Sequence, residues 1–422
     1  MTRKPAPDAR ALALQILREV LGGRGFASER LDALLERRRL GAADRGLCTQ
    51  LVYGVLREKG FLDRVVSEYV SAAKTPSGLR HLLRLAAYQA LCLDKVPDHA
   101  VVHESVELAK RLFGAPPARM VNAVLRKVIA DRQKHLEDRR DPAGAFPEWM
   151  LERWRRRYPT ATLEALLAYF QDLPPVGLRV NLNSSDPEKV AGRLREAGLE
   201  VGRIPETPLL TLRGLDRERL APLLRAGEIS VQDPHSYRVA EAVAARPGET
   251  GLDACAGHGG KSAAILEACP DLQLWVHEPA AARLQELKAN FRRLGLKAPR
   301  VLASAAEGAR RGLSFDWILV DAPCSGMGTL GRKPEIRWRL QPKDLARLAV
   351  GQRAILEEWW PRLKPGGRLI YAVCSLEPEE GADLIRAFAA DHPEVEPGAM
   401  REWRPDGDPG DGFFVANLRR RT

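Results

Sequence analysis

Apolar residues recur every three to four positions through roughly the first 130 residues, the spacing of amphipathic helices. Leu12, Ile16 and Val20 share one helical face under this spacing. Glycine and proline clusters interrupt the pattern, as at 22–23 and 114–117. The pattern predicts an all-α bundle with helices over residues 11–20, 31–40, 47–56, 61–70, 79–93, 101–113 and 118–129.

The pattern changes in the middle of the chain. Residues 130–145 are charged and lose the helical period, which indicates a linker. The segments that follow predict a small α+β unit, with helices over 147–158, 163–171 and 187–197 and strands near 177–181, Val201 and Leu209.

From about Ser230, short apolar runs alternate with helical segments. Strands are predicted over 251–254, 272–277, 299–302, 316–320 and 368–373, and helices over 261–268, 280–294 and 342–363. This alternation is typical of a doubly wound, mostly parallel sheet. The chain is therefore expected to be multidomain: an all-α domain over 1–138, a small α+β domain over 139–229 and an α/β Rossmann-like domain over 230–422.

Charge and cysteine content narrow the class of protein. The 66 Lys and Arg residues exceed the 55 Asp and Glu residues, giving a net charge of +11, which suits an anionic partner such as nucleic acid. The six cysteines are scattered without a CxxC pair, so neither a disulfide framework nor a metal site is expected. With no apolar run of about 18 residues and no leader-like segment, we expect a cytoplasmic protein without a membrane span.

Basic and aromatic residues interleave in the segment 149–158. It holds Trp149, Trp154 and Tyr158 among four arginines, a combination that suits single-stranded RNA, although some of these aromatic side chains must belong to the core.

A glycine-rich turn follows the first predicted strand of the α/β domain, in the stretch Cys255-Ala-Gly-His-Gly-Gly-Lys261. Glycines let a ligand approach the backbone closely, and the next helix offers free N–H groups. Cys255 stands where a phosphate-binding P-loop needs its first glycine, which excludes that motif. Glu278 follows the next strand, where an acid binds ribose hydroxyls, so an adenosine-bearing cofactor is expected.

Two cysteines follow strands of the same predicted sheet. Cys324 lies in Asp321-Ala-Pro-Cys-Ser-Gly326, and Cys374 ends the run from Leu369. The carboxyl edge of such a sheet is where ligands bind. An activated cysteine can add to C6 of cytosine and make C5 nucleophilic enough to take a methyl group. The remaining helical cysteines, Cys48, Cys92 and Cys269, are expected to be packing residues.

These motifs resemble those of the bacterial ribosomal RNA cytosine-5 methyltransferases of the Sun/Fmu type, over essentially the whole chain. The amino-terminal helices look like the NusB fold that this family carries. The resemblance implies a NusB-like RNA-binding bundle, a small α+β linker domain and a Rossmann-like methyltransferase domain that depends on S-adenosylmethionine.

The resemblance also implies roles for individual residues. Cys374 would be the nucleophile, Cys324 would assist release of the product, and Asp321 would contact both base and cofactor. S-adenosylmethionine would be held by Cys255, Ala256, Gly257, His258, Gly259, Gly260, Lys261, Glu278 and Asp321. The substrate would be a cytosine in a single-stranded loop or bulge of 16S small-subunit ribosomal RNA, and the protein a monomer without metal. Spacing alone does not decide which thiol attacks, because both follow strands.

Several positions depart from the family pattern around the cofactor. His258 stands where the family has Pro, Ala280 replaces the second acid after the second strand, and Ala305 lies where an Asp commonly contacts adenine, leaving Glu307 as the nearest acid. These departures favour one alternative, a non-catalytic RNA-binding or ribosome-assembly protein with a decayed cofactor pocket. A second alternative, the same chemistry on transfer RNA, differs only in the substrate and is not excluded by the sequence.

Overall fold

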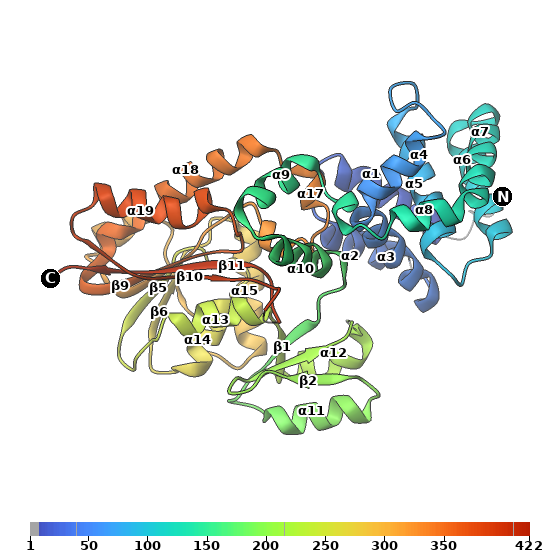
Figure 1. The fold of residues 1–422 in the computed structure, drawn as a ribbon. Helices are drawn as coiled ribbons and strands as arrows, with labels where there is room; N and C mark the ends of the chain where they lie inside the picture. The colour runs from blue at the N-terminus through green and yellow to red at the C-terminus, as the bar shows by residue number, and fades with distance from the viewer. Residues whose placement is uncertain (1–7, 39, 215, 408) are drawn as a thin grey trace. The chain divides into compact units, whose positions relative to one another are not determined.

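The computed structural model describes residues 8–38, 40–214, 216–407 and 409–422 (Figure 1). They group into two compact units. Unit 1 comprises Met1–Asp172 with Leu330–Leu340, and unit 2 comprises Leu173–Thr329 with Gln341–Thr422. This grouping has two units, whereas the sequence predicts three domains over 1–138, 139–229 and 230–422. The three-domain division stays a prediction. No described helix is long and apolar enough to cross a membrane.

Unit 1 contains the seven predicted helices, each at its expected place. They are α1 Ala9–Leu21, α2 Ala27–Arg38, α3 Ala42–Arg57, α4 Lys59–Ser67, α5 Ser77–Cys92, α6 Asp98–Phe113 and α7 Ala115–Ala130. The face formed by Leu12, Ile16 and Val20 is buried, with at most 5% of each residue exposed. Helix α5 is buried along most of its length, because it packs against α1, α3, α4, α6 and α7.

The prediction of a linker over 130–145 is wrong. This segment forms helix α8, Arg132–Asp138, and a 3-10 turn, Pro142–Ala145. His135 of α8 is fully buried and hydrogen-bonds the Tyr69 hydroxyl, so a charged stretch with few apolar residues still packs on the bundle. Helices α9, Glu148–Arg157, and α10, Thr160–Gln171, follow as predicted.

Two of the aromatic residues in the segment 149–158 belong to the core. Trp154 is 2% exposed and Tyr158 8% exposed, and Trp154 packs against Phe146 and Phe170. The two rings are therefore unavailable for stacking on RNA bases, and only Trp149 of the three is half-buried.

Segment Leu330–Leu340 belongs to unit 1, although its neighbours in sequence belong to unit 2. It contains the short helix α17, Ile336–Arg339. Arg337 is 1% exposed and donates hydrogen bonds to the carbonyl oxygens of Arg57 and Phe170, and Trp338 Nε1 donates to Leu56 O at 2.7 Å. These bonds satisfy backbone groups that would otherwise be buried without partners.

Unit 2 contains a small antiparallel sheet of four strands in the order β2-β3-β1-β4. Its strands are β1 Val176–Val180, β2 Val201–Arg203, β3 Leu209–Leu212 and β4 Ile229–Val231, and its helices are α11 Pro187–Glu196 and α12 Arg217–Arg225. The apolar side chains of β1 and β3 pack against both helices around Leu178, Leu194 and Leu220. The α+β pattern is confirmed, and β4 and α12 add to the predicted elements.

The large sheet of unit 2 has seven strands in the order β10-β11-β9-β8-β5-β6-β7. Strands β5 to β9 pair in parallel, and β10 and β11 form an antiparallel pair beside β9. The bounds are β5 Thr250–Asp253, β6 Gln273–Val276, β7 Arg300–Val301, β8 Phe315–Asp321, β9 Leu363–Val373, β10 Val395–Trp403 and β11 Phe413–Arg420. All five predicted strands are present, which confirms the Rossmann-like class.

Helices cover both faces of this sheet (Figure 1). Trp317 and Leu319 of β8 point to the layer of α13 Pro234–Ala242, α14 Gly260–Ala268 and α15 Ala281–Arg293. Ile318 and Val320 point to the layer of α16 Ala305–Arg310, α18 Pro342–Trp359 and α19 Ala382–Asp391. This alternation fills both cores, since successive strand residues face opposite sides.

Candidate active site at the carboxyl edge of the large sheet

The strand order reverses between β5 and β8. From β5 the chain passes outward to β6 and β7 and then returns to β8 on the other side. Asp253 ends β5 and Asp321 ends β8, so a carboxylate follows each of the two central strands. In open α/β sheets this switch point is where ligands bind.

Lys261 and Asp321 form an ion pair at the switch point. Lys261 Nζ, in the first turn of α14, lies 2.6 Å from Asp321 Oδ2. Burial disfavours the charged form of Lys261, but the attraction and hydrogen bond of Asp321 outweigh it and raise its pKa. Asp321 Oδ1 has no hydrogen bond with any residue that the structure describes and is free to accept one from a ligand.

Asp253, at the end of β5, is buried with 2% of the residue exposed, and its carboxylate interacts electrostatically with Asp321 and Lys261. Its carboxylate accepts hydrogen bonds from Ser262 Oγ at 2.5 Å and from the Cys255 N–H at 3.2 Å. Burial raises the pKa of Asp253 to about 6, against the effect of the Ser262 hydrogen bond. The residue fixes the start of the glycine turn.

The two predicted thiols meet. Cys324 Sγ lies 3.3 Å from Cys374 Sγ, because the parallel strands β8 and β9 deliver both residues to the same edge. The hydrogen bond to Cys374, together with burial, raises the pKa of Cys324 well above its ordinary value. The raised pKa favours the protonated form of the Cys324 thiol. Among the cysteines predicted to be packing residues, burial raises the pKa values of Cys48 and Cys92 to about 12.

The glycine turn brings the predicted cofactor residues next to Glu278. Gly259 has a φ of 79°, and a Cβ there would lie 2.8 Å from the Leu287 side chain, so only glycine fits. The Gly257 N–H donates to Glu278 Oε2 at 3.1 Å, and the Ala280 N–H donates to Oε1 at 2.8 Å. Glu278 thus links the turn to the end of β6.

The surroundings of this turn are acidic, which fits S-adenosylmethionine. Burial, and then the charges of Asp253, Asp321 and Glu278, raise the pKa of the Cys255 thiol well above its ordinary value. A group of carboxylates that disfavours a thiolate favours a cation, and the donor carries a sulfonium and an ammonium group. Spare lone pairs on Glu278 suit the ribose hydroxyls.

Two side chains near the predicted cofactor region, those of His258 and Glu307, interact with other groups of the protein. The His258 side chain is 67% exposed and lies 2.6 Å from Glu286, so it turns away from the buried carboxylates. Glu307 accepts from the Ala303 N–H and pairs with Arg311, which uses its carboxylate to hold the start of α16. Ala256 and Gly260 contribute backbone to the turn.

Residues that the sequence reasoning did not single out hold the two thiol loops. Glu380, Gln352, Ser325 and Ser375 form one buried hydrogen-bonded cluster. The only sequence signal was polar residues directly after each cysteine, at Ser325 and Ser375.

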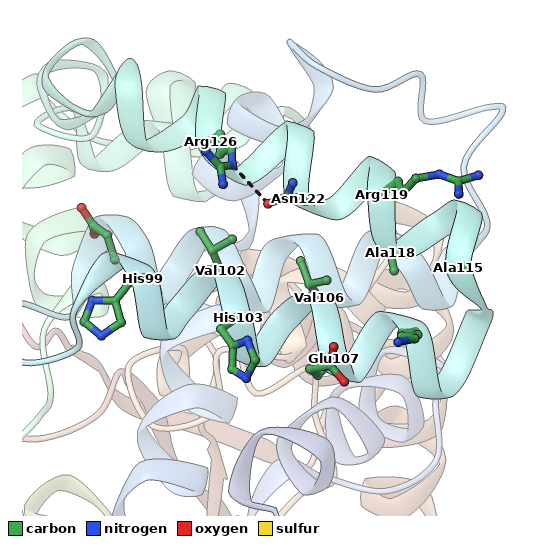
Figure 2. Close-up of a pocket in the computed structure, with 12 residues that line it drawn as sticks. His99, Val102, His103, Val106, Glu107, Ala115, Ala118, Arg119, Asn122 and Arg126 are labelled. Carbon is green, nitrogen blue, oxygen red and sulfur yellow. Dashed lines mark hydrogen bonds between the residues drawn. The ribbon is translucent and has the colours of Figure 1, made fainter.

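A groove of about 710 Å³ lies in unit 1 between α6 and α7 (Figure 2). Its floor includes Val102, Val106 and Ala118, and Arg119 and Arg126 extend from α7. None of the predicted catalytic or cofactor residues lines it.

Family models match three parts of the chain. One described as 16S rRNA methyltransferase RsmB/F matches residues 240–419, the NusB family matches 7–130, and the ferredoxin-like domain of RsmF/B-like methyltransferases matches 146–210. Among solved structures, PH0851 has a TM-score of 0.82 at 24% identity, covering 99% of this chain and 100% of that one. NSun6 from Pyrococcus horikoshii with SFG has a TM-score of 0.58 at 18% identity, covering 66% and 100%.

A curated relative extends over almost the whole chain. The probable ribosomal RNA small subunit methyltransferase B of Bacillus subtilis (strain 168) is 32% identical over 449 residues, covering 98% of this chain and 99% of that protein. The chain therefore belongs to the RsmB/F family of small-subunit ribosomal RNA methyltransferases.

Proposed function

We propose that this protein methylates C5 of a cytosine in 16S small-subunit ribosomal RNA through a bond between Cys374 Sγ and C6 of the base. The observation that carries the proposal is the pair of thiols 3.3 Å apart, beside the Lys261–Asp321 ion pair. A thiol nucleophile is needed to activate C5, because that carbon is a poor nucleophile in the aromatic ring.

The surroundings of the two thiols support a division of roles between them. The hydrogen bond to Cys374 and burial both raise the pKa of Cys324, which favours its protonated form. A thiolate formed at Cys374 would accept a hydrogen bond from Cys324 and would be attracted by the Lys261 ammonium. These features support Cys374 as the nucleophile and Cys324 as its proton-bearing neighbour.

Addition of Cys374 to C6 breaks the aromaticity of the ring and gives C5 nucleophilic character. Asp321 would orient the base through its free Oδ1, while Oδ2 stays paired with Lys261. After methylation a water molecule would take the C5 proton, the electrons of the C5–H bond would re-form the C5–C6 double bond, and the Cys374–C6 bond would break with Cys374 leaving as a thiolate. Cys324, the neighbouring thiol, would assist this release by interacting with the Cys374 sulfur as it leaves.

S-adenosylmethionine, the donor used by this family, supplies an electrophilic methyl group when bound. We propose that the backbone of the Cys255–Lys261 turn and the carboxylates of Glu278 and Asp321 hold it, with Asp253 fixing the turn. His258 would contribute its backbone, because its side chain turns toward Glu286.

The RNA would be a loop or bulge whose cytosine can leave its stack. The net charge of +11 supports backbone binding. In unit 1, Arg119 and Arg126 line the α6–α7 groove, and no ion pair joins either of them to another described residue. We propose this groove as an RNA-backbone site of the NusB-like domain.

Transfer of labelled methyl groups to unmodified 16S RNA, followed by nucleoside analysis, tests the proposal. Label is expected in 5-methylcytosine, and Cys374→Ala should abolish it, whereas Cys269→Ala, directly after α14, should not. Transfer RNA in a parallel reaction should remain unlabelled. Label in another nucleoside, or undiminished label with Cys374→Ala, would contradict the proposed chemistry.

The outward His258 and the engaged Glu307 favour one rival, a non-catalytic RNA-binding protein with a decayed cofactor pocket. Calorimetric titration with S-adenosylmethionine separates the two. Saturable binding supports the enzyme, and no heat at millimolar cofactor supports the rival.

A further inference from the structure

A buried carboxylate binds the residues that follow the two thiols, and it belongs to a residue with no role in the proposed reaction. Glu380 is fully buried at the end of the 3-10 turn Pro378–Glu380, just before α19. Its Oε1 accepts the Ser325 N–H at 2.8 Å, and its Oε2 accepts the Ser375 hydroxyl at 2.6 Å. Ser325 follows Cys324 and Ser375 follows Cys374, so one carboxylate joins the two loops that carry the thiols.

Gln352 of α18 completes this connection on the other side of Cys324. Its Nε2 donates to Glu380 Oε1 at 2.9 Å and to Pro323 O at 3.0 Å, and Gln352 is 1% exposed. Cys324 is therefore held through the residue before it and the residue after it. The Tyr371 hydroxyl donates to Glu380 O at 2.7 Å, which fixes the backbone of the turn as well.

Every group around the Glu380 carboxylate can donate a hydrogen bond: the Ser325 N–H, the Gln352 amide and the hydroxyls of Ser325 and Ser375. An ionised carboxylate can only accept, so it matches this surrounding, whereas an amide would place donors opposite donors. Such a cluster is rigid when all of its members are satisfied.

We infer that Glu380 is a positioning residue that holds Cys324 and Cys374 at their short separation by binding the serine that follows each of them. This inference rests on the proposed function for its catalytic meaning, but the positioning itself is independent of methyl transfer. Glu380 does not touch the reacting atoms.

The charge of Glu380 also acts on Cys324. After the hydrogen bond to Cys374 and burial, Glu380 is among the charges that raise the pKa of the Cys324 thiol. Removing the charge should therefore lower that pKa, a change that loss of packing alone would not single out.

The test compares Glu380→Gln with the wild type, using Asp383→Asn on α19 as the matched control, since Asp383 is exposed and pairs only locally with Arg386. A reagent with two thiol-alkylating arms measures how readily Cys324 and Cys374 are bridged. We expect Glu380→Gln to give at least about tenfold less bridged product relative to singly alkylated product, and its pH profile of Cys324 alkylation to shift to lower pH. In methyl transfer, kcat should fall by about 10- to 100-fold, with the KM for S-adenosylmethionine within about twofold.

Unchanged bridging and an unchanged alkylation profile in Glu380→Gln would overturn the inference. If Glu380→Gln does not fold, Ser375→Ala removes a single hydroxyl from the cluster and should change bridging in the same direction, and no change there would equally overturn it. If Glu380→Gln gives less bridging but the wild-type protein methylates no cytosine, the positioning role is upheld and the proposed function fails.

Discussion

Lys261 and Asp321 form a 2.6 Å ion pair that joins the first turn of α14 to the end of β8. The charge of Asp321 contributes to the raised pKa of the buried acid Asp253, and the charge of Lys261 acts in the opposite direction. The positive charge of Lys261 therefore offsets the negative charges of two carboxylates, Asp253 and Asp321, that follow neighbouring strands.

Lys261→Met should leave Asp321 without its partner and weaken the edge of the sheet. We expect the free energy of opening of β5 and β8, measured by hydrogen exchange of their backbone amides, to fall by about 1–3 kcal/mol. Methyl transfer should fall by about 100-fold. Lys288→Met on the exposed side of α15 is the control. Equal protection in the two variants would contradict a structural role for the pair.

The thiol variants should separate attack from release. Cys324→Ser retains Cys374, so the bond to C6 forms but breaks slowly, and a covalent protein–RNA complex should accumulate. Cys374→Ser should give no such complex, because a hydroxyl is a far weaker nucleophile than a thiolate. Denaturing gel electrophoresis with labelled RNA measures both. A complex with Cys374→Ser alone would exchange the two roles.

The groove between α6 and α7 should contribute a salt-dependent part of RNA binding (Figure 2). Arg119→Gln and Arg126→Gln should each weaken binding similarly for all sequences, and each should reduce the slope of log K against log salt by about 0.7–0.9. Filter binding over a range of salt concentrations measures the slope. Arg111→Gln on α6 is the control, because Arg111 already pairs with Asp8. An unchanged slope in both groove variants would exclude the site.

The strands of the large sheet, and the reactive residues that follow them, were the most predictable part of the molecule. Cys324 and Cys374 could be expected at one edge because parallel strands end on the same side of a sheet, and their contact follows from the direct pairing of β8 with β9. The helices of unit 1 followed from apolar spacing, since packing one face against a core requires that spacing.

Contacts between distant residues could not be predicted. Helix α8 has few apolar residues, so its burial depends on His135 meeting Tyr69, 66 residues earlier. Arginine is usually exposed, yet Arg337 is buried, and its two terminal guanidinium nitrogens donate to unit 1 oxygens distant in sequence. Glu380 acts through Ser325, 55 residues away, and nothing local in sequence marks such a pair.

Asp253 should make the stability of unit 2 depend on pH in a defined direction. Its pKa is raised from 3.8 to about 6 in the folded protein, first by burial. An acid whose folded pKa exceeds its unfolded pKa binds its proton more tightly in the folded protein. The contribution of Asp253 to the free energy of unfolding is therefore present in full below about pH 4 and is lost as the pH rises to about 6. The difference between the two pKa values corresponds to at most about 3 kcal/mol.

Comparison with Asp253→Asn isolates this contribution, because the amide does not titrate. The free energy of opening of β5, wild type minus Asp253→Asn, should fall between about pH 4 and pH 6 and stay level above that range. Hydrogen exchange of the β5 amides measures it. Asp271→Asn, an exposed change just before β6, should show no such fall. A difference that rises with pH would mean that Asp253 is stabilised as the anion, with Ser262 and Lys261 outweighing its burial.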